Sequence, residues 1–234
     1  MTKLLPTLFA LAVASVTAHA QAPAAGAPAA APAAAPAAPA GAKSIEAKVA
    51  MCIGCHGIPG YQASFPEVYK VPMISGQSAK YIAAALTAYK NGDRKHPTMR
   101  GIADTLSEQD INDISAYYEK HGQVQGRTAG DKPSREPSAQ VAALLQKAAC
   151  VSCHGANFSK PIDPSYPKIA GQHGDYLFVA LKAYKTENNP TVGRNNAVMG
   201  AIAKQFSNAE LKAMSNYLGS LQGDLVTRPE NKFR

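Results

Sequence analysis

The sequence predicts an all-α protein in which one small helical domain occurs twice in tandem. Segments of the chain recur at offsets of 95 to 100 residues, each copy has three segments with helical patterns, and strand patterns are scarce. At about 100–200 residues per domain, a chain of 234 residues accommodates two small domains. Much of its 46% hydrophobic fraction is alanine, which buries little surface. We therefore expect a group other than side chains to complete each core.

The N-terminal part carries two segments that precede the repeats. Residues 1–20 are predicted to be a cleaved signal peptide, because a short basic start is followed by an apolar run and by the triplet Ala18-His19-Ala20. The apolar run is shorter than the roughly 20 residues of a membrane-spanning helix, although an uncleaved anchor is the alternative. Residues 21–43 form an Ala/Pro-rich spacer that cannot bury a core. Export to the periplasm argues against a nucleic-acid partner despite the net charge of +8, and it leaves peripheral membrane association through the spacer open.

The remaining chain divides by its repeats and by composition. We expect a first domain at residues 44–122, a linker at 123–137, a second domain at 138–223 and a C-terminal tail at 224–234. The linker is rich in Gly, Pro and charged residues, which is typical of a boundary between domains.

Three helices are expected in each domain. The first leads into a cysteine pair, at 44–52 and 138–150, and opens with a serine that can cap it. The second is expected at 78–91 and 174–187. The third begins at Ser107 or Ser207, where Ser-x-x-Asp and Ser-x-x-Glu predict capping boxes.

Each domain contains one Cys-x-x-Cys-His motif, made of Cys52, Cys55 and His56 or of Cys150, Cys153 and His154. Cysteines three residues apart lie close together on a helical turn, so both thiols can bond to the two vinyl groups on one porphyrin edge. The histidine is then held beneath the ring as an axial ligand of the iron. The motifs therefore predict two covalently bound haem c groups. A zinc site, a thioredoxin-type redox disulfide and a structural disulfide fit less well, because the pairs lie 98 residues apart, lack a βαβ setting and are each followed by a histidine.

The repeat also selects a second axial ligand. Among the candidate Met and His side chains, only Met99 and Met199 are matched by the same ligand-competent residue in the other copy. Both are expected in loops just before the last helix, and His96 is the alternative ligand for the first haem. His/Met ligation raises the reduction potential and leaves no open position for oxygen or peroxide, which favours electron transfer over catalysis.

Prolines at matched positions are candidate supports for the histidines. The carbonyls of Pro72 and Pro167 are possible acceptors for the second ring N–H of a ligating histidine. Alternatively, the two prolines only stiffen a turn.

The paired Cys-x-x-Cys-His motifs, the Gly-Gln-x-x-x-Tyr helix starts at Gly76 and Gly171, and the two methionines resemble the dihaem cytochrome c4 family over residues 44–222. The resemblance implies an all-α fold of two tandem class I cytochrome c domains, each wrapped around a covalently bound haem. It carries over cysteines, histidines and methionines as haem-binding residues: Cys52, Cys55, His56, Met99, Cys150, Cys153, His154 and Met199. The iron ligands among these would be His56, Met99, His154 and Met199.

The resemblance further implies a periplasmic electron carrier without catalytic residues. Its partners would be redox proteins of a respiratory chain, namely a quinol-oxidising cytochrome bc complex and a terminal oxidase or reductase. Two alternatives stay open from the sequence. One is an electron-transfer subunit of a periplasmic dehydrogenase or oxidase complex, and the other is a dihaem peroxidase-like enzyme, which would need an iron with a displaceable ligand.

Overall fold

A computed structural model describes residues 43–123 and 129–230 of the chain. The expected signal peptide, the spacer except for its last residue, part of the linker and the end of the tail lie outside the described residues. No helix within the described residues is long and apolar enough to cross a membrane.

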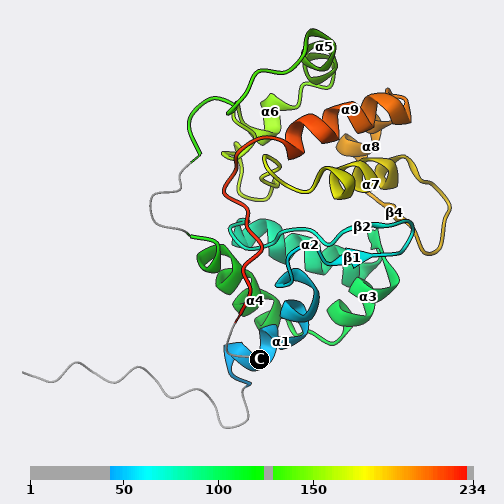
Figure 1. The fold of residues 1–234 in the computed structure, drawn as a ribbon. Coiled ribbons are helices and arrows are strands. Elements are labelled where there is room, and N and C mark those ends of the chain that lie inside the picture. Colours follow the sequence, from blue (N-terminus) through cyan, green and yellow to red (C-terminus); the bar gives the residue numbers. More distant parts are fainter. Residues whose placement is uncertain (1–42, 124–128, 231–234) are drawn as a thin grey trace, which may run out of the picture. The chain divides into compact units, whose positions relative to one another are not determined.

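The first repeat is built from four helices (Figure 1): α1 (Ile45–His56), α2 (Ala79–Asn91), α3 (Pro97–Asp104) and α4 (Glu108–His121). Between α1 and α2, the short strands β1 (Gln62–Ala63) and β2 (Tyr69–Lys70) pair antiparallel. Serine side chains cap three of these helices: Ser44 and Ser107, as the sequence predicts, and also Ser78. The helices enclose a core of apolar side chains: Val49, Ile82, Leu86, Leu106, Ile111, Ile114 and Tyr118.

The second repeat has the same order of helices, but its first helix is divided in two and no strand pair is described between α6 and α7. Its helices are α5 (Ala139–Lys147), α6 (Val151–His154), α7 (Gly174–Lys185), α8 (Ala197–Ala203) and α9 (Asn208–Gly219). The single helix predicted at 138–150 is wrong at its end, because Ala149 adopts a left-handed conformation with φ 49°. The chain therefore turns before the cysteine pair, and Cys150 is the N-cap of the separate short helix α6.

The two methionines do not lie in loops, so that prediction is wrong. Met99 and Met199 are each the third residue of a short helix, α3 or α8. The Nδ1 atom of His96 caps α3 by accepting the Met99 N–H at 3.3 Å, and the Oδ1 atom of Asn196 caps α8 by accepting the Met199 N–H at 2.9 Å. Helices of eight and seven residues are too short to show a clear apolar period in the sequence.

The turn before the second helix of each repeat joins it to the last helix. The N–H groups of Gly76 and Gly171 donate to the carbonyls of Tyr118 and Leu218, each at 2.9 Å. In this way α2 packs on α4 and α7 packs on α9. Gly76 has φ 92°, and a Cβ atom there would lie 2.6 Å from the Asp224 carbonyl oxygen, so only glycine fits.

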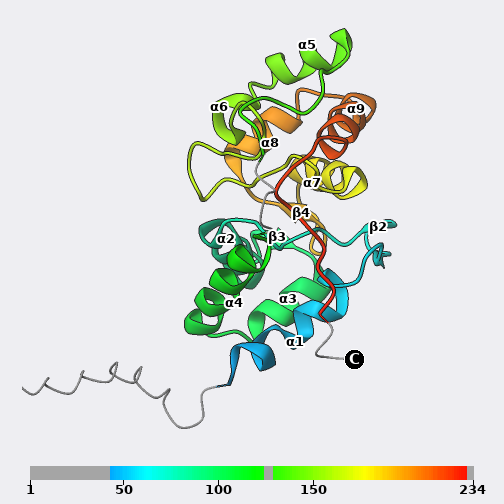
Figure 2. The same cartoon turned by 60° about the vertical axis from the view of Figure 1, so that its left-hand side comes forward.

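The two repeats contact each other through strands and through the C-terminal segment. Strand β3 (Arg94–Lys95) pairs antiparallel with β4 (Gly193–Arg194). The segment after α9 runs back along the first repeat toward α1 (Figures 1 and 2). On the way, the N–H of Val226 donates to the carbonyl of Ser75, in the turn before α2, at 3.1 Å. The Leu225 side chain of this segment is buried. We call residues 223–230 the C-terminal strap.

Candidate functional site

The first Cys-x-x-Cys-His motif lies at the end of α1. Cys52 and Cys55 are about one turn apart, and His56 is the last residue of the helix. The Nδ1 atom of His56 lies 2.8 Å from the carbonyl oxygen of Pro72, which confirms that this proline serves as an acceptor. Burial lowers the pKa of His56, so its imidazole is neutral at pH 7. With the proton on Nδ1, the lone pair of Nε2 is available to a metal, and no hydrogen bond to Nε2 is found among the described residues.

The second motif repeats this arrangement. Cys150 directly precedes α6 as its N-cap and His154 ends the helix, with the Nδ1 atom of His154 at 2.9 Å from the carbonyl oxygen of Pro167. Burial lowers the pKa of His154 as well, and only 9% of the residue is exposed. Gly155 follows with φ 80°, where a Cβ atom would lie 1.9 Å from the Lys160 carbonyl oxygen. The sharp turn after the motif therefore requires glycine.

The cysteines are available for covalent attachment. None of the four forms a disulfide. Burial raises the pKa of both Cys52 and Cys150 to about 11, so these thiols stay protonated at neutral pH. Cys52 packs against the core of the first repeat and Cys150 against the core of the second.

The structure brings Met99 to the same core as Cys52, since both side chains pack against the apolar cluster of the first repeat. Met199 is partly buried at the matched position of α8, but it is not among the described residues that pack against the second cluster. The alternative ligand His96 has both ring nitrogens occupied. Its Nδ1 caps α3, and its Nε2 lies 3.1 Å from the hydroxyl of the buried Tyr69. The structure therefore favours Met99 over His96 as the ligand.

Two arginines that the sequence analysis did not single out lie next to each other in the β3–β4 pair. Each guanidinium lies 5.2–5.8 Å from the centroids of two tyrosine rings: Tyr81 and Tyr89 for Arg94, and Tyr176 and Tyr184 for Arg194. Within residues 43–123 and 129–230, neither forms an ion pair with a carboxylate. The signal was present in the sequence, because the offset of 100 that relates Met99 to Met199 also relates these arginines.

The donor set of each repeat suits a haem c. It consists of two thiols, a neutral imidazole with a free Nε2, a thioether on a short helix, and a part-buried guanidinium without an acidic partner among the described residues. Thiols attach to vinyl groups, imidazole and thioether bind iron, and the guanidinium offers positive charge to the carboxylates of the cofactor.

Comparison with known proteins identifies the family. The cytochrome c family profile matches residues 38–121 and 138–222. The chain is 30% identical over 191 residues to cytochrome c4 of Stutzerimonas stutzeri, covering 77% of this chain and 89% of that protein. It is 28% identical over 178 residues to the thiosulfate dehydrogenase electron acceptor of Stutzerimonas stutzeri, covering 73% and 78%. The solved structure of Acidithiobacillus ferrooxidans cytochrome c4 aligns with a TM-score of 0.53 at 26% identity, covering 74% of this chain and 99% of that one.

These comparisons confirm the predicted all-α fold of two tandem cytochrome c domains and the two covalently bound haem c groups. They also confirm that the protein transfers electrons and is not an enzyme. The chain belongs to the cytochrome c4 family of dihaem electron-transfer cytochromes.

Proposed function

We propose that this cytochrome is exported to the periplasm, after cleavage of residues 1–20, and carries electrons in a respiratory chain. The donor would be a quinol-oxidising cytochrome bc complex and the acceptor a terminal oxidase or reductase. One haem would be held by residues 44–122 and the other by residues 138–223, joined by the linker at 123–137.

In each domain, two cysteines form the thioether bonds and a histidine and a methionine bind the iron: Cys52, Cys55, His56 and Met99 in the first, and Cys150, Cys153, His154 and Met199 in the second. One observation carries this proposal. Both repeats hold the histidine in the same way, with Nδ1 at 2.8 or 2.9 Å from a proline carbonyl oxygen, and within residues 43–123 and 129–230 neither Nε2 atom forms a hydrogen bond.

The surrounding residues support transfer of single electrons. The bound haem iron supplies this chemistry by alternating between its ferric and ferrous states. The proline carbonyls of Pro72 and Pro167 fix the orientation and tautomer of each imidazole, so the ligands need not rearrange between the two states. The methionine sulfur would favour the ferrous state and would leave no position on the iron for oxygen or peroxide. The guanidinium groups of Arg94 and Arg194 would balance the haem carboxylates.

Mass spectrometry of the mature chain tests the attachment. We expect the mass of two haem groups on the wild type and of one on the double variant Cys52→Ala/Cys55→Ala. The matched variant Cys150→Ala/Cys153→Ala should also retain one haem, on the other domain. Added mass that survives removal of all four thiols would contradict the proposed attachment.

Carbon monoxide binding tests the axial methionines. A reduced carrier with both iron–methionine bonds intact should bind carbon monoxide poorly. Met99→Ala should open the first haem and Met199→Ala the second. Strong binding by the wild type would instead indicate an open iron and contradict the proposed ligation.

A second candidate function is favoured by one comparison. The similarity to a protein described as the electron acceptor of thiosulfate dehydrogenase supports a role as the electron-transfer partner of a periplasmic dehydrogenase. The two candidates differ in what reduces the protein. Reduction by a purified dehydrogenase but not by a cytochrome bc complex would favour this second function, and the reverse result would favour the respiratory carrier.

A further inference from the structure

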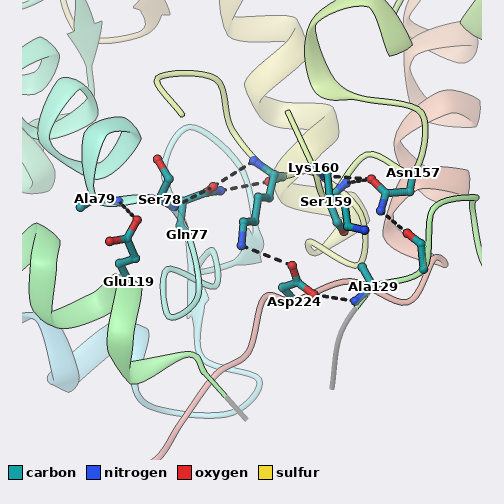
Figure 3. A network of polar contacts seen from close by, with 11 residues as sticks. Gln77, Ser78, Ala79, Glu119, Ala129, Asn157, Ser159, Lys160 and Asp224 are labelled. Carbon is teal, nitrogen blue, oxygen red and sulfur yellow. Dashed lines mark hydrogen bonds and ion pairs between the residues drawn. The ribbon is translucent and has the colours of Figure 1, made fainter. Parts of the chain in front are cut away.

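One buried glutamine of each repeat forms hydrogen bonds with the other repeat. The amide of Gln172 binds both backbone groups of Met73, accepting its N–H at 3.0 Å and donating to its carbonyl at 2.8 Å. The amide of Gln77 binds Lys168 in the same way, at 2.9 and 3.0 Å, and Figure 3 shows this side chain extending across to the other repeat. The two glutamines are only 3% and 4% exposed. They occupy matched positions, as do Met73 and Lys168, so the arrangement follows the internal repeat.

Each glutamine binds the same peptide group that supports a histidine of the opposite repeat. The N–H of Met73 and the carbonyl of Pro72 belong to one peptide unit, and that carbonyl lies 2.8 Å from Nδ1 of His56. Lys168 and Pro167 likewise form one peptide unit, whose carbonyl lies 2.9 Å from Nδ1 of His154. Two hydrogen bonds in series therefore join Gln172 to His56, and two others join Gln77 to His154.

Hydrogen bonds in series strengthen one another. When a peptide N–H donates to a glutamine oxygen, electron density moves toward the carbonyl of the same peptide, which becomes a better acceptor. The Nδ1–H bond of the histidine is then more polarised, and Nε2 becomes a stronger electron donor. A stronger donor stabilises the oxidised state of a metal and lowers its reduction potential. Burial of both glutamines removes the competing water that would weaken this effect.

We propose that each glutamine is a positioning residue that lowers the reduction potential of the haem in the opposite domain: Gln172 acts on the first haem through Pro72 and His56, and Gln77 acts on the second through Pro167 and His154. This inference rests on the proposed ligation by His56 and His154. It makes each potential depend on contact between the two domains.

The competing explanation is that the glutamines only hold the two domains together. Their loss would then loosen the contact between the domains and admit water to the haems. Water stabilises the more highly charged oxidised state, so loosening lowers the potential. Loss of the hydrogen-bond relay raises it. The sign of the change and the haem that it affects therefore separate the two explanations.

The test is a redox titration of the full-length, haem-loaded protein. Gln172→Leu removes the acceptor for Met73, and Gln77→Leu is the matched variant in the other domain. NMR signals of the two axial methionine methyl groups assign each potential to its haem. We expect Gln172→Leu to raise the ratio of reduced to oxidised first haem at fixed potential roughly twofold to threefold, which is about 20–30 mV at 59 mV per tenfold change.

In the same variant, the second haem should be unaffected, and Gln77→Leu should give the converse pattern. A change in the haem of the glutamine's own domain, an equal change in both haems, a lowered potential or no change would each overturn the proposal. The proposed ligation itself would be contradicted by a wild-type protein that carries no haem, or by potentials that stay unchanged when His56 and His154 are replaced. The two failures are therefore distinguishable.

A second measurement covers the case in which the leucine variants do not fold. Gln172→Glu keeps an oxygen acceptor for the Met73 N–H. The carboxyl is buried against the Met73 carbonyl and therefore stays protonated, donating to that carbonyl as the amide does. In the reduced protein, the Nδ1–H proton of His56 should then move to higher field, because a neutral carboxyl oxygen is a weaker acceptor than an amide oxygen and polarises the peptide less. The corresponding proton of His154 should not move. An unchanged His56 proton would overturn the relay.

Discussion

Replacing His96 with alanine should release Met99 from the first haem. His96 caps the helix that carries this methionine, and its Nε2–H donates to the buried Tyr69 hydroxyl. A lost N-cap costs about 1 kcal/mol, and a lost hydrogen bond costs about the same. In the wild type, unwinding the first turn of α3 and withdrawing His96 from Tyr69 breaks both bonds, whereas in the variant it breaks neither. Opening should therefore become easier by about 2 kcal/mol, which is about thirtyfold in the equilibrium.

Carbon monoxide affinity of the reduced first haem at pH 8 measures this opening, because the apparent affinity is proportional to the open fraction. We expect about thirtyfold tighter binding for His96→Ala. His96→Asn copies the cap of the second repeat and loses only the contact with Tyr69, so its gain should be about fivefold. Asn196→Ala is the matched control and should affect only the second haem, about fivefold. Unchanged affinity in His96→Ala would refute the reasoning, as would an equal effect on both haems.

Three further perturbations test the scaffold. Hydrogen bonds from Ser107 and the ammonium of Lys48 hold the pKa of Asp110 well below its usual range, so this carboxylate stabilises the fold above pH 4 and its contribution is lost as the pH falls. The drop in urea midpoint from pH 7 to pH 3 should therefore be smaller in Asp110→Asn than in the wild type, and an equal drop would contradict this. Leu225→Ala in the C-terminal strap should cost about 2–5 kcal/mol in urea unfolding, because the side chain is buried; a loss below 1 kcal/mol would show that the strap contributes little. Gly76→Ala should displace the strap near Asp224 and expose it to proteolysis, whereas Gly60→Ala, at an open position with φ 73°, should not.

Much of the site could be predicted because its signals are local or repeated. A Cys-x-x-Cys-His motif lies within about one helical turn, and serine caps act within three residues, so both can be read directly from the sequence. Met99 and Met199 are distant from their motifs, and only the internal repeat related them.

Other features depend on tertiary contacts and left weaker signals. The short helices α3 and α8 carry His96 and Asn196 as caps in place of serine, and the left-handed Ala149 interrupts a segment with a continuous helical pattern. The pairing of the two arginines in β3 and β4 forms only when the two repeats contact each other. The same holds for the hydrogen bonds of the glutamines between the repeats. Residue patterns within one repeat do not contain that information.

The near-infrared absorption of the oxidised protein tests most directly whether each iron is closed by histidine and methionine, since the iron–methionine bond has its own charge-transfer band. We predict a band in the wild type that falls to half in Met99→Ala, to half in Met199→Ala, and disappears when both methionines are replaced. A band of full intensity in the double variant would contradict the account.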